Sequence, residues 1–271
     1  MRTLSDFLRT TPGLEAADTE WLHLLVEDWH LLADLSFSDL VLWLPREGGW
    51  VAAAHTRPMT GPMVFVEDIV GQGEAAVFGD LVSRAVRDGQ SEHVRERGQD
   101  LLHERARPVR RAGRMIGVLS VHDQLDSGRP LTRLEESYGH MSDELFLMVA
   151  EGTWPTTGSP SGARRGAPRV GDGVMRLDVA GVVHYASPNA LSAIRKLGHQ
   201  GPIEGEVLLQ VISGVAGQPG QLDEGLALVA MGRAAWRSDL AANGAALALR
   251  AVPLMHGRER HGAIVLARDV S

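Results

Sequence analysis

The residues best suited to metal chemistry lie near the N-terminus of the chain. His23, Glu27 and His30 are spaced so that a helix would place all three side chains on one face. Imidazole nitrogens and carboxylate oxygens are ligands that zinc takes. The same face also carries Glu20 and Asp34, and it lies opposite a stripe of Leu and Trp residues. A continuous polar face of this kind is typical of a solvated helix surface, so we expect no metal site here.

The sequence offers little for phosphate binding or nucleophilic catalysis. The stretch Gly71-Gln-Gly-Glu-Ala-Ala76 imitates a dinucleotide fingerprint. Acidic residues interrupt the segment before it and hairpins surround it, so we interpret it as a loop. The sequence contains neither a Gly-Lys-Ser/Thr phosphate loop nor a Gly-x-Ser-x-Gly elbow to accompany His122 and Asp123. A stand-alone enzyme that uses His and Asp side chains is therefore the least favoured function.

Composition excludes further classes of protein. The chain has 271 residues, 44% of them hydrophobic, a net charge of −7 and Cys 0. Without cysteine there can be no iron–sulfur cluster, no Cys-ligated zinc and no chromophore attached through cysteine. The negative charge argues against direct nucleic-acid binding. Because the sequence has no signal peptide and no apolar run of about 18 residues, we expect a cytoplasmic protein that does not contact a membrane.

Residues 155–171 divide the chain into two predicted domains. This stretch is rich in Gly, Pro, Ser and Thr and carries three arginines and no acid, a composition typical of a linker. We therefore predict one domain over residues 1–154 and another over residues 172–271. Both are predicted to be α+β, each an antiparallel sheet covered by helices.

Hydrophobic periodicity and turn residues predict the elements of each domain. In the first domain we expect helices over 18–35, 74–87 and 132–151, hairpins over 39–55 and 107–122, and a short strand over 64–66. In the second we expect a helix capped by Ser187, a helix over 222–231, and strands over 174–177, 182–185, 234–241, 245–253 and 262–268.

The second domain resembles a PAS domain. The stretch Leu177-Asp-Val-Ala-Gly-Val-Val-His-Tyr-Ala-Ser-Pro-Asn-Ala190 is similar to the opening of that family. The last residues, Ile264-Val-Leu-Ala-Arg-Asp-Val-Ser271, are similar to its final strand. This resemblance covers about 100 residues.

The first domain resembles the GAF domain of actinobacterial PdtaS-type sensor histidine kinases, in which a GAF and a PAS domain precede the kinase module. Three stretches carry the resemblance: Trp29-His-Leu-Leu-Ala-Asp-Leu-Ser-Phe-Ser-Asp-Leu-Val-Leu-Trp43, Arg57-Pro-Met-Thr-Gly-Pro62 and Leu147-Met-Val-Ala-Glu-Gly-Thr-Trp-Pro155. Together with the PAS-like segments, they span most of the chain.

The resemblance implies the sensory input region of a cytoplasmic, dimeric two-component kinase. Such a kinase uses ATP to phosphorylate itself and passes the phosphoryl group to a response regulator with an RNA-binding output domain. The family's phosphoacceptor box, His-His-Arg-Val-Lys-Asn-Asn, and its ATP-binding boxes do not occur in this sequence. We therefore expect a sensor region without its catalytic half and without enzyme activity of its own. A GAF–PAS sensor coupled to a phosphatase or a cyclic-nucleotide enzyme stays open as an alternative.

Both kinds of domain enclose cavities between the sheet and its helices. Candidates for lining the first cavity are Trp43, His55, Arg57, Arg110 and His122. Taken singly, each residue of this set is more commonly core or solvated. The sequence requires no cofactor, although His55 and His122 leave a GAF haem open.

Candidates for lining the second cavity are Tyr185, Asn189, Trp236 and Arg250. Aromatic residues on amphipathic elements usually belong to a core, so packing in the core is the alternative to a place in the cavity wall. The PAS resemblance would place a haem ligand between Gln200 and Leu254. That stretch contains no His, which disfavours haem in the second domain.

Overall fold

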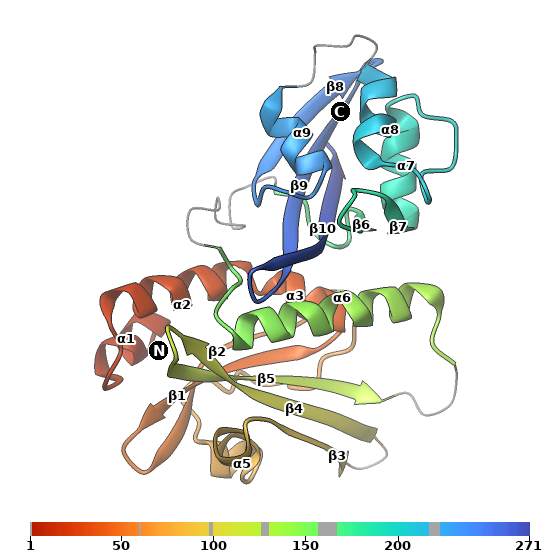
Figure 1. The fold of residues 1–271 in the computed structure, drawn as a ribbon. Helices are drawn as coiled ribbons and strands as arrows, with labels where there is room; N and C mark the ends of the chain where they lie inside the picture. Colours follow the sequence, from red (N-terminus) through yellow and green to blue (C-terminus); the bar gives the residue numbers. More distant parts are fainter. Residues whose placement is uncertain (1, 60, 98–99, 126–129, 157–166, 217–222) are drawn as a thin grey trace. The chain divides into compact units, whose positions relative to one another are not determined.

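The computed structural model describes residues 2–59, 61–97, 100–125, 130–156, 167–216 and 223–271 (Figure 1). The chain divides into two units, Met1–Pro155 and Thr156–Ser271. Most of the predicted linker, residues 157–166, lies outside the described residues. Within the described part, the helices are too short or too polar for any of them to span a bilayer.

The first unit is an antiparallel sheet with helices on both faces (Figure 1). Its helices are α1 (Leu4–Thr10), α2 (Ala16–Asp28), α3 (His30–Ser36), α4 (Glu74–Val77), α5 (Leu81–Asp88) and α6 (Arg133–Ala150). Its strands are β1 (Asp39–Arg46), β2 (Gly49–Thr56), β3 (Ser91–Arg97), β4 (Asp100–Arg111) and β5 (Arg114–Leu125), in the order β2-β1-β5-β4-β3. Helices α2, α3 and α6 cover one face, and α5 covers the other.

Strand β1 shows why this sheet needs cover on both faces. Six consecutive residues, from Asp39 to Leu44, are buried. Alternate side chains of a strand point to opposite faces, so Val41 and Trp43 join the core beneath α5. Leu40 and Leu42 point to the face covered by the other helices and are also fully buried.

The second unit is an antiparallel sheet covered by three short helices, α7 (Pro188–Lys196), α8 (Leu208–Ala216) and α9 (Glu224–Ala230). Its strands are β6 (Val174–Leu177), β7 (Val183–Ala186), β8 (Arg237–Ala242), β9 (Ala245–His256) and β10 (Glu259–Asp269), in the order β7-β6-β10-β9-β8. The core lies between the sheet and the helices, with Leu249 and Val265 from the strands and Ile194 and Ile212 from the helices among its members. The predicted α+β class is confirmed for both units.

Several predicted elements were wrong in detail. The predicted first helix is interrupted at Trp29, which separates α2 from α3. The predicted helix over 74–87 is two helices, because the chain turns at Gly79, whose φ is +71°. Residues 64–66 form no strand in the structure. Helices α1 and α8 and strand β3 were not predicted.

Candidate functional site

Four strands of the first sheet align acidic and basic side chains in one row. Asp39 of β1 lies opposite His122 of β5, which lies opposite Glu104 of β4, which lies opposite His93 of β3. Directly opposed residues of an antiparallel sheet share one face, so all four side chains point to the side of α5. We call Asp39, His122, Glu104 and His93 the acid–base row. Its first three members are fully buried, and His93 at the sheet edge is partly exposed.

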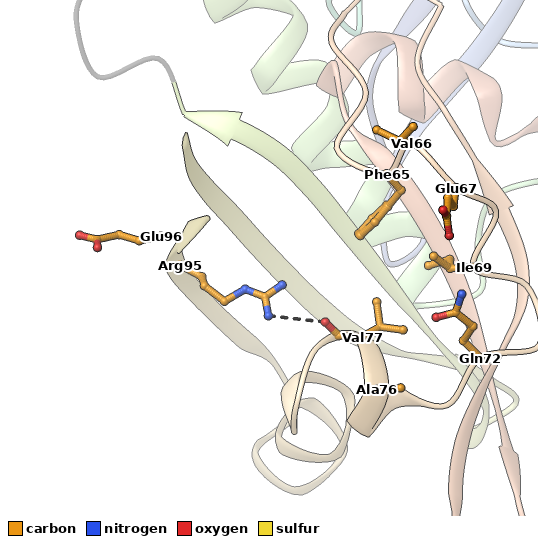
Figure 2. Close-up of a pocket in the computed structure, with 9 residues that line it drawn as sticks. All are labelled: Phe65, Val66, Glu67, Ile69, Gln72, Ala76, Val77, Arg95 and Glu96. Carbon is orange, nitrogen blue, oxygen red and sulfur yellow. Dashed lines mark hydrogen bonds between the residues drawn. The ribbon is translucent and has the colours of Figure 1, made fainter. Parts of the chain in front are cut away.

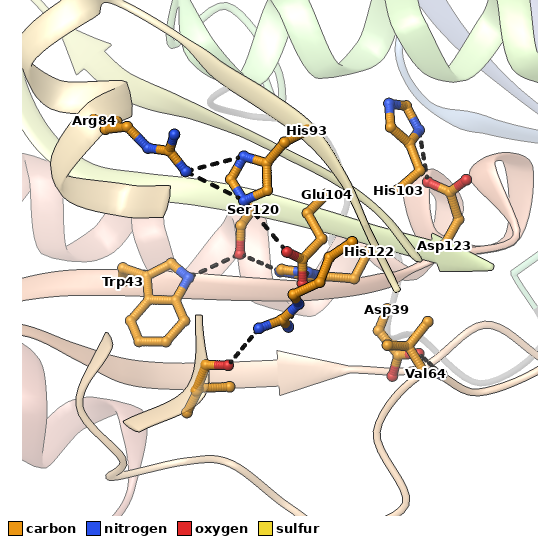
Figure 3. Close-up of polar contacts among 12 residues, drawn as sticks. Asp39, Trp43, Val64, Arg84, His93, His103, Glu104, Ser120, His122 and Asp123 are labelled. Carbon is orange, nitrogen blue, oxygen red and sulfur yellow. Dashed lines mark hydrogen bonds and ion pairs between the residues drawn. The ribbon is translucent and has the colours of Figure 1, made fainter. Parts of the chain in front are cut away.

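Hydrogen bonds fix the orientation of His122 (Figure 3). The indole Nε1 of Trp43 donates to Ser120 Oγ over 2.8 Å, and the same oxygen lies 2.7 Å from His122 Nε2. An indole N–H can only donate, so the hydroxyl of Ser120 accepts from Trp43 and its own proton is available to His122. This arrangement assigns the proton of a neutral His122 to Nδ1, which lies 3.5 Å from Glu104 Oε1.

Basic groups from the two neighbouring strands, β3 and β5, surround Glu104. Arg95 Nη2 is 2.8 Å from Oε1, and His93 Nε2 is 3.5 Å from Oε2. Burial by itself would raise the pKa of the Glu104 carboxyl, but its interactions with His122 and the Arg95 guanidinium outweigh burial and hold that pKa below its usual value. Complete burial lowers the pKa of His122. At neutral pH the row therefore holds a charged Glu104 beside a neutral His122.

Asp39, at the other end of the row, fastens the loop that follows β2. Its Oδ1 lies 2.9 Å from His55 Nε2, and its Oδ2 accepts the backbone N–H of Val64 over 2.5 Å. The side chains of Asp39 and His55 are both almost completely buried. The carboxylate therefore satisfies a loop amide, which explains why residues 64–66 do not pair as a strand.

Two further contacts hold the same loop, which we call the 57–69 loop. Arg57 donates from Nε to the carbonyl of Phe65 over 2.9 Å and from Nη2 to the carbonyl of Val66 over 3.3 Å. At its other end, Asp34 of α3 accepts the backbone N–H of Met59 over 2.7 Å. These bonds connect Met59 to α3 and Arg57 to the backbone at residues 65 and 66.

The 57–69 loop forms one wall of a pocket of about 490 Å³ (Figure 2). Helix α4 and strand β3 form the others. The lining residues are Phe65, Val66, Glu67, Ile69, Gln72, Ala76, Val77, Arg95 and Glu96. The pocket touches the acid–base row through Arg95, the counter-ion of Glu104, and through Phe65, whose ring packs edge-on against His122 with a centroid distance of 5.2 Å.

Comparison with known proteins places the chain in a family. The model of the GAF domain of the histidine kinase PdtaS matches residues 4–142, about half of the chain. The chain belongs to this family. It is 34% identical over its whole length to the sensor histidine kinase PdtaS of Mycolicibacterium smegmatis and 36% identical to that of Mycobacterium tuberculosis H37Rv. The chain spans 56% of the length of these relatives.

A solved structure described as the sensor region of a sensor histidine kinase agrees with this assignment. It shares 34% identity with the chain, covers 100% of it, is itself covered to 98%, and superposes with a TM-score of 0.79. The part of PdtaS to which this chain corresponds is therefore the sensor region. The first unit is its GAF domain, and the acid–base row and the pocket both lie there.

The structure assigns different roles to the predicted residues of the GAF cavity. Trp43 and His122 belong to the buried network, while His55 and Arg57 hold the loop that forms the pocket wall. None of the five predicted residues is among the described residues that line the pocket, and Arg110 takes no part in the network or the loop contacts either. A β-bulge precedes it in β4 and its side chain is exposed near the turn to β5, away from the other four.

The sequence pattern missed the residues that join the network to the pocket. Glu104 and Arg95 lie on strands rich in charged residues, where nothing distinguishes the buried acid from its exposed neighbours. The signal that could have found Glu104 is its position within the alternation Leu102, Glu104, Ala106, in which its neighbours on the same face are apolar. The segment Gly71–Ala76 was interpreted as a loop without a binding role, yet its last three residues belong to α4, and it supplies Gln72 and Ala76 to the pocket.

In the second unit the predicted cavity residues do not come together. Leu249 and Ala251 of β9 face the helices, so Arg250 between them points to the opposite face of the sheet. Tyr185 pairs with Arg176, while the flanking pairs contribute Met175 and Leu177 to the core, which places Tyr185 on the face away from the helices as well. Both assignments to the cavity were wrong.

The other two predicted residues, Asn189 and Trp236, make hydrogen bonds at the surface of the second unit. Asn189 is exposed, and its Nδ2 donates to the carbonyl of Gly171 over 2.7 Å. Trp236 is 40% exposed, and its Nε1 lies 3.4 Å from the carbonyl of Gly225.

The polar helix face near the N-terminus forms no metal centre. In the described part of the chain, His, Asp and Glu side chains nowhere gather in groups of three or more that could hold a metal ion. The prediction of a solvated face needs one correction, because Asp34 is buried, where it accepts the amide of Met59.

Proposed function

We propose that the chain is the signal-input region of a cytoplasmic two-component histidine kinase and that a small molecule bound in the GAF pocket is its signal. The observation that carries this proposal is the pocket itself. Its volume of about 490 Å³ lies in the range of small-molecule sites, roughly 300–1,000 Å³. Apolar side chains of Phe65, Ile69 and Val77 line it beside a few polar ones.

The contacts around the pocket connect a bound ligand to the acid–base row. A ligand seated there would touch the 57–69 loop on one side and β3 on the other. The loop is tied to Asp39 and β3 is tied through Arg95 to Glu104. A ligand that binds one arrangement of these two walls more tightly than another shifts the population toward that arrangement.

The remaining parts of the proposal concern the whole protein. By similarity to the PdtaS relatives, we propose that it dimerises, phosphorylates itself with ATP and transfers the phosphoryl group to a response regulator with an RNA-binding output domain. We also propose that the second unit is a PAS domain. The motif at 177–190 supports this, because it contains the turn before β7 and the Ser187 cap of α7.

Two neighbouring alanines of α4 allow a matched test of the pocket. Ala76 lines the pocket and Ala75 does not, although both are exposed. We expect a thermal-shift screen of the chain with a metabolite library to find a ligand that raises Tm, since a ligand specific for the folded state stabilises it. Ala76→Trp should abolish this shift, and Ala75→Trp should leave it intact.

The same ligand should change kinase activity in the full-length protein. The gene is sequenced downstream of codon 271, and the encoded protein is purified and assayed for autophosphorylation with radiolabelled ATP. We expect the ligand to change the rate in the wild type and the Ala75→Trp variant but not in the Ala76→Trp variant. A downstream sequence without a phosphoacceptor box, or a ligand response that survives Ala76→Trp, would refute the proposal.

A further inference from the structure

We infer that the GAF pocket takes a small amphoteric molecule, with a carboxylate-type group that binds Arg95, an ammonium group that binds Glu67, and an apolar body between them. This inference rests on the proposed function and adds the chemical class of the signal. It follows from how charge is distributed over the walls of the pocket.

Arg95, on the β3 wall of the pocket, has N–H donors that can bind a ligand. Its Nη2 is committed to Glu104 at 2.8 Å, whereas its Nη1 makes only a long contact of 3.5 Å with the carbonyl of Val77. A guanidinium carries five N–H donors in a planar fork that suits a carboxylate. The side chain is 41% exposed, and it points along the pocket toward Val77 (Figure 2).

The surroundings of Arg95 allow it to share its charge with a ligand. Glu104 also has His93 and His122 within 3.5 Å. These contacts with Glu104 remain when Arg95 uses some of its N–H donors to bind a second carboxylate. The guanidinium also lies over the ring of Phe78, with 5.9 Å to the centroid. This contact holds the fork beside the pocket.

The opposite wall is acidic. Glu67 lies on the 57–69 loop beside Ile69 and Gln72, on the other side of the pocket from Arg95, while Glu96 is turned outward (Figure 2). Among the described residues that line the pocket, Arg95 is the single cation. Two carboxylates against one cation disfavour a polyanion, whereas a ligand that carries both an ammonium and a carboxylate group can pair with Glu67 and with Arg95 at once.

Between the two charged walls the surface is apolar. Phe65, Ile69 and Val77 supply ring and aliphatic carbon. A methylene chain that links the two charged groups of the ligand would bury its carbon there, and this burial favours binding. The pocket thus fits an amino-acid-like molecule better than a neutral or a highly charged one.

Probes that differ only in charge test this class. 4-Aminobutanoate, 5-aminopentanoate and 6-aminohexanoate are titrated calorimetrically into the chain, each beside its N-acetyl derivative, which keeps only the acid, and its amide, which keeps only the amine. We expect at least one of the three amphoteric molecules to bind ten-fold or more tightly than both of its derivatives. Binding of all three no tighter than their derivatives, or no binding at all, would overturn the inference.

Three single substitutions locate the two charged contacts. Arg95→Gln and Glu67→Gln should each weaken binding of the amphoteric molecule at least ten-fold, and Glu96→Gln should change it less than two-fold. Glu67 is on the surface, so its variant stays informative if Arg95→Gln unfolds the domain. Unchanged affinity in Glu67→Gln contradicts the inference. If a different metabolite binds and Ala76→Trp blocks it, the amphoteric class is wrong and the proposed function stands; if Ala76→Trp blocks nothing, the proposed function itself is wrong.

Discussion

Glu104 and His122 face each other across β4 and β5 with Nδ1 of the histidine 3.5 Å from Oε1 of the carboxylate, and neither side chain is exposed to solvent. A buried acid of this kind is tolerated because charged and polar partners replace its water. Here Arg95 supplies the charge and His122 supplies an oriented ring. The pair therefore links the stability of the GAF unit to its pocket.

Removal of the Glu104 charge should destabilise the GAF unit strongly. Glu104→Gln removes the carboxylate that pairs with Arg95 over 2.8 Å and that lies beside the buried His122. Because the Arg95 side chain is 41% exposed, water replaces part of the lost contact, and we expect a loss of about 1.5–3 kcal/mol, the range for a hydrogen bond to a charged group. Urea unfolding followed by circular dichroism measures the change. Glu92→Gln on β3 is the matched control, because Glu92 is exposed and its contact with His103 is worth less than about 1 kcal/mol. Equal losses in both variants would contradict this role of Glu104.

Stability should fall on mild acidification because of His122. Its pKa in the folded state lies below the usual 6.5 because it is buried. Between these two values the unfolded chain binds a proton that the folded chain does not, so the free energy of unfolding decreases as pH drops below about 6.5, by up to about 1.4 kcal/mol per pH unit. The lowered pKa of Glu104 adds a further loss below the usual value of 4.5.

His103 should act in the opposite direction and offers a control for the pH experiment. Its pKa is raised by contacts with Asp123 and Glu92, so its contribution to stability is present below about 6.5 and is lost as pH rises through the folded-state value. Urea unfolding at pH 5 to 8 should give a shallower acid loss for His122→Gln and a steeper one for His103→Gln. An unchanged slope in His122→Gln would disprove the assignment to His122.

Asp39→Asn should loosen the 57–69 loop. The carboxylate binds both His55 and the amide of Val64, and hydrogen bonds to a charged group contribute about 1.5–3 kcal/mol each. We expect amide exchange at Val64 to accelerate at least ten-fold and ligand affinity in the pocket to drop. Asp68→Asn is the comparison, since Asp68 is 41% exposed and 3.9 Å from His55. Protection of Val64 that persists in Asp39→Asn would show that other contacts hold the loop.

Ser187→Ala should destabilise the second unit. Its Oγ accepts the amide of Val174 over 2.9 Å and that of Ala190 at the start of α7 over 3.4 Å. Loss of a helix cap costs about 1–2 kcal/mol, and the buried amide of Val174 also loses its partner. Ser192→Ala, at an exposed position of the same helix, should change the free energy of unfolding by less than about 0.5 kcal/mol. Thermal unfolding of both variants gives the comparison.

Local signals predicted the elements that local contacts stabilise. The last helix of the GAF unit was predicted to begin at Thr132, and a capping box between Thr132 and Glu135 does start α6 there. The Ser187 cap was found in the same way. The segment at Val64 could not be read correctly, because its amide bonds to Asp39, which lies 25 positions earlier in the chain.

The candidate site depended on strand register, which single residues do not reveal. Tyr185 was assigned to the wrong face because a β-bulge between Arg176 and Leu177 changes the pairing of β6 with β7. Glu104 and Arg95 were missed because their importance comes from what lies opposite and diagonal to them on neighbouring strands. Trp43, His55 and His122 were predicted to line the cavity, but they are not among the described residues that line the pocket; they take part in the buried contacts beside it.

The acid–base row also restricts how the GAF sheet can assemble. A slip of one residue between β4 and β5 would turn Glu104 toward the other face of the sheet. A slip of two would keep its face but place it opposite Ser120 or Gln124, so that the buried acid would lose His122 as its partner. Misaligned pairings of β4 with β5 thus carry an electrostatic penalty that the native one avoids. The alternation of acid and base across β1, β5, β4 and β3 therefore favours the native strand register over other registers that hydrophobic burial alone would allow.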